Sequence, residues 1–289
     1  MIPSLDERRV EDAVRAALAE DLGEAGDITS AATIPADATA VADFGVRKAG
    51  VIAGLPLAAA VFQALDPQVK FEVLRNDGSH VAPGTVIARV SGNARAVLAG
   101  ERVALNYLCH LSGVATAAAA LIEKTRGTRA VILDTRKTTP GLRAFEKYAV
   151  ACGGATNHRF GLYDAVLIKD NHIAVAGGVG EAIRRAREHA PGKKVEIEVG
   201  SLAELDEALT EGPDIILLDN MSVADMAEAV RRTAGRAKLE ASGNVTVDTV
   251  AAIAATGVDY ISSGWITHSA PALDIGLDIE ISRSQAPVR

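Results

Sequence analysis

Basic side chains cluster in one stretch of a chain that is acidic as a whole. The sequence has 289 residues and a formal net charge of −7. From Asp134 to Asp170 it holds six Lys or Arg against four Asp or Glu, with His158 in addition. A local group of cations on an acidic background attracts a small anion without attracting polyanions in general. We therefore expect an anion site built from Arg136, Lys137, Arg159 and Lys169.

Two carboxylates and two loops of small residues lie further along the chain. Glu198 and Asp219 each end an apolar run and offer hard oxygen ligands, which favour Mg²⁺ held together with substrate oxygens. Ser242-Gly243-Asn244 and Ser263-Gly264 also follow apolar runs, and small residues there let backbone amides approach a phosphate. The basic side chains, the two carboxylates that could bind Mg²⁺ and the loops that could bind a phosphate together predict the substrate. It should be a phosphorylated sugar with a diphosphate leaving group.

The elements that must position these residues alternate along the chain between short apolar runs and Ala-rich helical stretches. Strands buried on both faces have nearly continuous apolar sequences, and alternation with helices indicates parallel βαβ units. In an α/β barrel the active site lies at the carboxyl ends of the strands. We therefore predict an α/β barrel whose strands end at the candidate site residues. The expected strands are 131–133, 165–168, 195–197, 215–218, 239–241 and 260–262.

The first hundred residues have a different pattern. We expect a helix from about Leu5 to Glu20, followed by alternating, half-buried strands at Ala40–Val46 and Val69–Leu74. A long helix beginning near Glu101 carries Arg102, and the Ser112-Gly113 pair is expected to interrupt it. One stripe of this helix is a candidate contact surface for a partner subunit.

Composition excludes several classes of protein. The acidic balance and the absence of any Lys/Arg run longer than two argue against nucleic acid and membrane partners. We expect no 18-residue apolar window and no secretory signal, because the amino-terminal segment is acidic and amphipathic. Cys109 and Cys152 give no disulfide framework, so a cytoplasmic protein is predicted.

The candidate residues lie within longer motifs that closely resemble the quinolinate phosphoribosyltransferase family. The resemblance covers nearly the whole chain and is most specific in the ten residues from Asp134 to Arg143. The further motifs are Glu146-Lys147-Tyr148-Ala149-Val150, Asn157-His158-Arg159, Leu167-Ile168-Lys169-Asp170-Asn171-His172, Leu218-Asp219-Asn220-Met221, Leu239-Glu240-Ala241-Ser242-Gly243 and Thr267-His268-Ser269.

This resemblance implies a pentosyltransferase of de novo NAD biosynthesis. The enzyme would transfer phosphoribose from phosphoribosyl diphosphate to quinolinate with decarboxylation, giving nicotinate mononucleotide, diphosphate and CO2. It also implies an incomplete, seven-stranded α/β barrel at 113–269, joined to an N-terminal α+β open-sandwich domain at 1–112 plus 270–289. Six strands are visible in the sequence, so the seventh is expected near Thr156 to Arg159.

The resemblance also implies a role for each candidate residue. The quinolinate carboxylates would be surrounded by Arg136, His158, Arg159 and Lys169, with Thr135 also in contact with substrate, and with Arg102 donated by the neighbouring subunit of a homodimer. The phosphates of the donor would meet Lys137 and Lys169. Glu198 and Asp219 would bind Mg²⁺ and the ribose hydroxyls, and Lys137, Lys169, Glu198 and Asp219 would form the catalytic set. The sugar phosphate would lie against two loops, Ser242-Gly243-Asn244 and Ser263-Gly264-Trp265.

Four residues, at three places in the chain, depart from the usual pattern of the family. They are Asn244 after Gly243, the Trp265-Ile266 pair after Gly264, and Gly200 after the glutamate strand. Asn244 can adopt the unusual backbone angles that a second glycine would supply. Trp265 adds a bulky ring beside the expected phosphate site, so donor affinity or substrate scope is expected to differ.

Structural and functional alternatives remain for several residues. Arg136, Lys169, Glu198 and Asp219 could form a structural ion network, while Arg143 and Lys147 could hold their own helix. Glu196 and Glu240 are expected to be ion-pair partners inside the barrel, and His110, His172 and His268 to be structural. Two alternative functions also stay open. One is an aldolase-like enzyme with Lys169 as a Schiff-base nucleophile. The other is a noncatalytic anion-binding homologue, such as the molybdenum-transport-linked relatives.

Overall fold

The computed structural model describes residues 2–282, which form two compact units. Unit 1 takes in the described residues of the ranges 1–117, 144–154 and 270–289. Unit 2 comprises residues 118–143 and 155–269. The expected returning segment 270–289 is therefore described as far as residue 282, and its last seven residues lie outside the described part.

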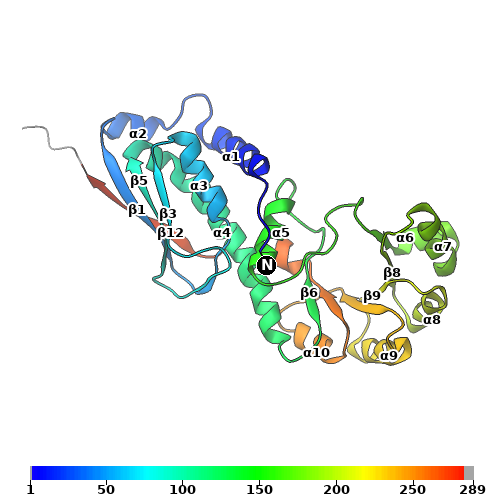
Figure 1. Ribbon diagram of the computed structural model, residues 1–289. Coiled ribbons are helices and arrows are strands. Elements are labelled where there is room, and N and C mark those ends of the chain that lie inside the picture. The colour runs from blue at the N-terminus through cyan, green and yellow to red at the C-terminus, as the bar shows by residue number, and fades with distance from the viewer. Residues whose placement is uncertain (1, 283–289) are drawn as a thin grey trace, which may run out of the picture. The chain divides into compact units, whose positions relative to one another are not determined.

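Unit 1 is built on a four-stranded antiparallel sheet in the order β12-β1-β5-β3 (Figure 1). Buried and more exposed positions alternate along β1, as the apolar alternation predicted. A second, two-stranded sheet pairs β2 with β4. The strands are β1 (Thr39–Val46), β2 (Gly50–Val51), β3 (Lys70–Val73), β4 (His80–Val81), β5 (Val86–Asn93) and β12 (Ile275–Ser282).

Helices pack on this sheet around a small aromatic core. Phe44, Phe62 and Phe71 come from β1, α3 and β3, with ring centroids 5.8 to 6.1 Å apart. Such aromatic contacts stabilise a core beyond their buried area. The helices that begin in unit 1 are α1 (Glu7–Leu22), α2 (Ile28–Thr33), α3 (Leu55–Leu65) and α4 (Ala94–Lys124), and α5 (Arg143–Cys152) joins them from a later part of the chain.

The expected interruption of the long helix at Ser112-Gly113 is wrong, because α4 runs unbroken through both residues. A side chain on Gly113 would lie 2.3 Å from the carbonyl oxygen of Pro271. Because glycine has no side chain, the returning C-terminal segment can pack directly against α4 at this position. The Ser112 hydroxyl accepts a hydrogen bond from Ala53 N at 3.0 Å.

Within residues 2–282, α4 is the one helix long and apolar enough to cross a membrane by length and composition. This corrects the expectation that no 18-residue apolar window exists. The window has a mean hydropathy of 1.4, and 56% of it is buried inside the structure. Buried core helices pass the same test, so the window alone is weak evidence for a membrane span.

Unit 2 contains a six-stranded parallel sheet in the order β6-β11-β10-β9-β8-β7. All six predicted strands are present, three of them one or two residues longer than expected. Their bounds are β6 (Val131–Leu133), β7 (Val166–Ile168), β8 (Val195–Val199), β9 (Ile215–Asp219), β10 (Lys238–Ser242) and β11 (Tyr260–Ser262). The parallel order places their carboxyl ends, and the polar residues there, at one edge of the sheet.

The predicted seventh strand near Thr156 to Arg159 is reduced to one parallel bridge between Leu133 and Thr156. Thr156 donates its N–H to Ile132 O at 2.9 Å and accepts the N–H of Asp134 at 3.2 Å. The next residue, Asn157, instead uses its side chain to hydrogen-bond Asp134. Within the described residues the sheet thus stays open between β6 and β7.

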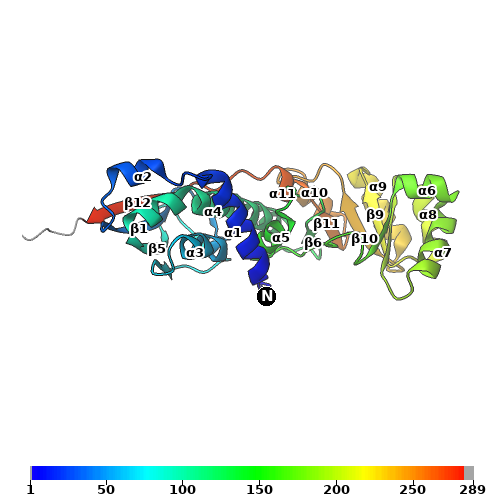
Figure 2. The same cartoon turned by 90° about the horizontal axis from the view of Figure 1, so that it is seen from above.

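Helices follow the strands and lie along the outside of this sheet (Figures 1 and 2). On α8, the apolar residues Leu205, Ala208 and Leu209 are buried, as expected for a helix packed along one face. The helices are α6 (Asp170–Ala176), α7 (Val179–His189), α8 (Leu202–Glu211), α9 (Val223–Thr233), α10 (Val250–Ala255) and α11 (Trp265–His268).

Ser222 caps the amino terminus of α9, since its hydroxyl accepts the N–H of Asp225 at 3.1 Å. Ser222→Ala should lower the free energy of unfolding by about 1 kcal/mol, because one N–H of the first turn loses its partner. Denaturant titration measures this change. Ser222→Thr, which keeps the hydroxyl that accepts from Asp225 N and donates to Asp225 Oδ2, should stay near the wild-type value, and equal losses in both variants would contradict the capping role.

Candidate active site

A cavity of about 330 Å³ opens at the carboxyl ends of the unit 2 strands. It brings together nine of the fifteen predicted substrate-binding residues: Thr135, Arg136, Lys137, His158, Arg159, Lys169, Glu198, Asp219 and Ser242. Asp134, Leu167, Leu217, Glu240 and Ser262 complete its lining. The basic side chains and the two carboxylates therefore face one shared space, as the sequence pattern predicted.

Asp134 organises the segment that carries His158 and Arg159. It is fully buried, and its carboxylate accepts hydrogen bonds from Asn157 Nδ2 at 2.8 Å and His158 N at 2.7 Å. A buried carboxylate needs such donors to offset its lost hydration. The sequence placed Asp134 at a strand end, but this positioning role depends on a segment more than twenty residues later.

Arg143 fixes the loop after β6. Its guanidinium donates to Phe160 O at 3.2 Å and to Thr138 Oγ1 at 3.0 Å, with a longer contact to Arg136 O at 3.4 Å. Arg143 thus holds two loops of the cavity wall rather than its own helix alone. Only tertiary contacts reveal this role, because its partners are backbone carbonyls and a hydroxyl.

Two guanidinium groups, those of Arg136 and Arg159, line the cavity. Burial first, and then the positive charge of Arg136, hold the pKa of Arg159 below its usual value. Arg136 Nε is buried and has no hydrogen-bond partner among residues 2–282. Arg159 donates from Nη1 to Ala165 O at 3.2 Å. Like charges held together with unused donors form a site that an anion would stabilise.

His158 lies between the carboxylates of two strands. Its Nε2 is 3.1 Å from Glu196 Oε2 and 3.4 Å from Glu240 Oε2, which confirms the expected ion-pair role of both glutamates. Burial lowers the pKa of His158, but the two nearby carboxylates outweigh it and raise the pKa above its usual value. Burial also raises the pKa of Glu196.

Lys169 and Glu198 form an ion pair, with Lys169 Nζ 2.5 Å from Glu198 Oε2. The backbone N–H of Lys169 donates to His172 Nδ1 at 2.9 Å, so His172 helps hold the lysine at the start of α6. The Lys169 side chain is 49% exposed and faces a carboxylate. A Schiff-base lysine is instead activated by an apolar pocket or a neighbouring cation, so the geometry does not favour the aldolase alternative.

Asp219 and the Ser242 loop are joined by Asn220. Asn220 Nδ2 donates to Asp219 Oδ2 at 2.8 Å, and its backbone N–H donates to Ser242 O at 2.9 Å. Gly243 has φ +98°, and a Cβ there would lie 2.2 Å from Asn220 Oδ1, so a side chain has no room. Asn244 adopts φ +50°, which confirms that it tolerates the angle of the glycine it replaces.

Gly243, Asn244, Ser263, Gly264 and Trp265 do not line this cavity as it is defined by residues 2–282. Ser263 is buried and its hydroxyl donates to Val245 O at 2.8 Å, while its neighbour Ser262 lines the cavity. In a three-residue strand, a shift of one position decides which side chain faces the site.

The Gly264 turn contacts Lys137, whose carbonyl also accepts the Thr267 hydroxyl at 2.7 Å. A side chain on Gly264 would lie 2.8 Å from Lys137 Cδ. Gly264 and Thr267 thus support a cavity lysine, a role that the sequence pattern did not indicate.

Arg102 lies on α4 in unit 1, where it is exposed. It lines a separate cavity of about 380 Å³ with Arg47, Cys109 and Asp274. The role assigned to it by resemblance concerns a neighbouring subunit, and it stays a prediction.

Comparison with protein families gives matches to two domains of one enzyme family, and together these matches cover most of the chain. Residues 27–112 match the quinolinate phosphoribosyl transferase N-terminal domain, and residues 114–278 match the C-terminal domain of the same family.

Individual relatives agree with this match. The nicotinate-nucleotide pyrophosphorylase (carboxylating) of Mycobacterium leprae is 46% identical over 93% of this chain and 96% of its own length. The quinolinate phosphoribosyltransferase (decarboxylating) 1b of Nicotiana tabacum is 43% identical over 92% of this chain and 81% of its own. The crystal structure of NadC from Streptococcus pyogenes superposes with a TM-score of 0.93 at 42% identity, covering 97% of this chain and 100% of that chain.

Proposed function

The chain belongs to the quinolinate phosphoribosyltransferase family, and from this premise we propose how its cavity carries out the family reaction. The reaction transfers phosphoribose from phosphoribosyl diphosphate to quinolinate with loss of CO2. Its products are nicotinate mononucleotide, diphosphate and CO2, and the reaction contributes to NAD biosynthesis. The enzyme is therefore a pentosyltransferase.

The convergence of Arg136 and Arg159 is the observation that carries this proposal. Quinolinate is a pyridine with two adjacent carboxylates, so it brings two negative charges side by side. The unpartnered Nε of Arg136 and the mutual repulsion of the two guanidinium groups match such a dianion. A site for a neutral acceptor would not need two facing cations.

The donor would occupy the other side of the cavity, near Lys137, Lys169, Glu198 and Asp219. As the bond between ribose C1 and diphosphate breaks, positive charge develops on the sugar, and the two carboxylates can stabilise it. The ammonium groups can neutralise the departing diphosphate. The pyridine nitrogen then bonds to C1, and the adjacent carboxylate leaves as CO2, while its electron pair stays on the ring carbon and accepts a proton.

The two carboxylates also fit Mg²⁺. Glu198 uses Oε2 toward Lys169 and Asp219 uses Oδ2 toward Asn220, which leaves Glu198 Oε1 and Asp219 Oδ1 as the candidate ligand atoms. Mg²⁺ is commonly held by one or two carboxylates together with substrate phosphate oxygens. When bound, Mg²⁺ would neutralise charge on the diphosphate group.

The Ser242 and Ser263 loops are the proposed site of the sugar phosphate, and Trp265 reports on the second of them. Trp265 is the only tryptophan in the chain and is half-buried. Saturation with phosphoribosyl diphosphate should therefore change tryptophan emission, because a dianionic phosphate would alter the polarity around the ring. Unchanged emission, with calorimetry showing that the donor is bound, would remove this loop from the site.

Several finer features belong to the same proposal. We propose a homodimer in which Arg102 reaches the partner subunit's cavity, and an open barrel in which the Thr156 segment occupies the seventh position. A cytoplasmic location is supported by the two free cysteines. A rice relative is named as chloroplastic, so location varies among related proteins.

Product analysis tests the proposed function. Purified protein should convert quinolinate, phosphoribosyl diphosphate and magnesium into nicotinate mononucleotide, identified by mass spectrometry. Nicotinate, which lacks the carboxylate next to the ring nitrogen, is the control acceptor and should react far more slowly. Product from nicotinate but not from quinolinate would contradict the assignment, and binding without any turnover would favour the noncatalytic alternative.

A further inference from the structure

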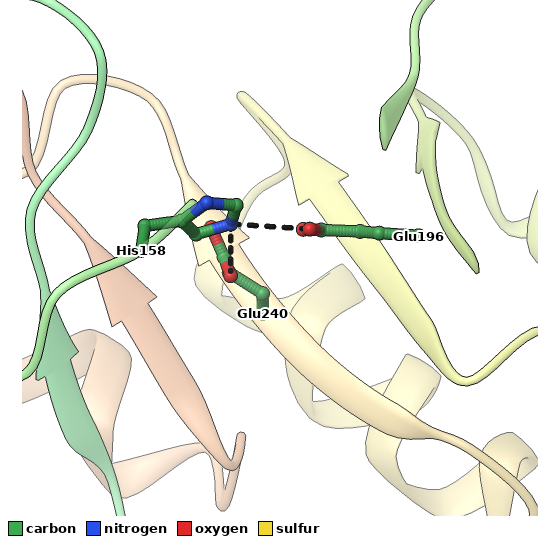
Figure 3. Close-up of side chains that lie close together, drawn as sticks. All are labelled: His158, Glu196 and Glu240. Carbon is green, nitrogen blue, oxygen red and sulfur yellow. Dashed lines mark ion pairs between the residues drawn. The ribbon is translucent and has the colours of Figure 1, made fainter. Parts of the chain in front are cut away.

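Two buried carboxylates lie at the cavity that is proposed to bind a dianion, and one of them, Glu240, forms part of its lining. Glu196 on β8 and Glu240 on β10 are 4% and 1% exposed, and the His158 ring points its Nε2 toward both carboxylates (Figure 3). Glu196 Oε1 and both Glu240 oxygens have no hydrogen-bond partner among the described residues. Buried carboxylates are costly and their charge would repel an anion, so the arrangement needs a specific reason.

A metal ion is one candidate reason, since one donor atom from each residue lies within 4.8 Å of the others. A metal on His158 Nε2 requires a lone pair there and a proton on Nδ1, and that proton normally points to an acceptor. Here the backbone N–H of Arg159 points at Nδ1 from 2.7 Å. Nδ1 therefore faces a donor, which is the wrong partner for a metal-bound histidine.

The same contact assigns the ring tautomer. Nδ1 accepts from Arg159 N, so it carries the lone pair, and Nε2 carries the proton that faces Glu196 and Glu240. The two carboxylates also favour a second ring proton, consistent with the raised pKa of His158. The Arg159 N–H opposes it, because a proton on Nδ1 would place two donors face to face. The geometry is that of the ring with its proton on Nε2.

This tautomer matters because the segment carrying Arg159 has little regular structure to hold it. Thr156 makes only an isolated bridge, and the next residues rely on side-chain hydrogen bonds. Asp134 fixes Asn157 Nδ2 and the His158 N–H, and His158 Nδ1 fixes the Arg159 N–H. The Arg159 guanidinium, which lines the cavity, is thus placed through the His158 ring.

We propose that Glu196 and Glu240 are positioning residues for quinolinate: they hold the His158 proton on Nε2, which leaves Nδ1 to fix the Arg159 backbone and aim its guanidinium into the cavity. This role rests on the proposed function. It explains why acidic side chains lie at an anion site, since they act on the His158 ring rather than on the substrate. Carboxylates suit this task because they only accept, whereas an amide can either accept or donate.

The double variant Glu196→Gln with Glu240→Gln tests the proposal, because it keeps the shape of both side chains but loses the obligatory acceptors. KM for quinolinate should rise about tenfold, as expected for one weakened hydrogen bond, while KM for phosphoribosyl diphosphate stays within about twofold. Asp259→Asn is the matched control. Asp259 pairs with Lys238 at the start of β10 and does not line the proposed active-site cavity, so both KM values should be unchanged.

Nitrogen-15 NMR of the histidine rings provides a readout that a merely structural role would not move. In the wild-type protein, His158 should show a protonated Nε2 and an unprotonated Nδ1, and this pattern should be lost in the double variant. His158→Gln identifies the signal. A proton on Nδ1 in the wild type, or an unchanged KM for quinolinate in the double variant, would overturn the proposal. Absence of product in the wild type would refute the proposed function instead. The NMR measurement would still show whether His158 Nδ1 accepts the hydrogen bond from Arg159 N.

Discussion

Arg136→Ala should reduce kcat/KM for quinolinate by several hundredfold while leaving the protein at least as stable as the wild type. The guanidinium can give two charge-assisted hydrogen bonds to a carboxylate, and together these contribute about 3 to 4 kcal/mol. In the substrate-free protein Arg136 lowers the stability of the fold, because its Nε is buried without a partner among the described residues and its charge repels Arg159. Its removal therefore weakens binding without weakening the fold. Steady-state kinetics and thermal unfolding measure the two effects.

Two further variants make this result specific. Arg136→Lys keeps the charge but loses the two-pronged geometry, so it should recover only a small part of the activity. Arg184→Ala removes an arginine that is 58% exposed and paired with Glu181 and Glu211, and it should leave kcat/KM unchanged. A large fall in the melting temperature of Arg136→Ala would show instead that this arginine belongs to a structural ion network.

Lys169→Ala should abolish detectable product formation, with a fall in kcat of at least about a hundredfold, as seen when a charge-stabilising donor is removed from an active site. The lysine lines the cavity and its Nζ contacts Glu198, so its loss removes a cation from the proposed diphosphate site and leaves a carboxylate unpaired. The fold should persist because the side chain is half-exposed. Single-turnover kinetics with saturating donor separate this chemical defect from weakened binding.

Lys193→Ala is the matched control, since Lys193 is exposed and does not line the proposed active-site cavity. It should behave like the wild type. Borohydride added during turnover should trap no covalent adduct on Lys169. Wild-type turnover by Lys169→Ala would remove the lysine from the mechanism, and a trapped adduct would restore the Schiff-base alternative.

The strands of unit 2 could be predicted because buried parallel strands have a distinctive composition. Runs such as Ile215–Leu218 are continuously apolar, and the residue that follows each run emerges at the same edge of the sheet. Arg136, Lys169, Glu198 and Asp219 could therefore be assigned to one site from their positions in the sequence alone. Sequence motifs that resemble the family gave the substrate.

Features that depend on tertiary contacts could not be predicted in the same way. The Thr156 segment pairs through one bridge, which leaves no periodicity to detect. Gly113 looks like a helix breaker in sequence, but its neighbour is the distant Pro271. Arg143 and Asp134 position loops through partners that no local pattern identifies. In the short strand β11 the facing residue is Ser262 rather than Ser263, because the phase of alternation is set by packing.

Counting CO2 against diphosphate tests the central claim most directly, since the cavity is proposed to hold a dianionic acceptor and a diphosphate donor together. Quinolinate carrying an isotopic label in the carboxylate next to the ring nitrogen should release one labelled CO2 for each diphosphate formed. It should release none when phosphoribosyl diphosphate is omitted. Diphosphate release without labelled CO2, or equal turnover with nicotinate, would contradict the account.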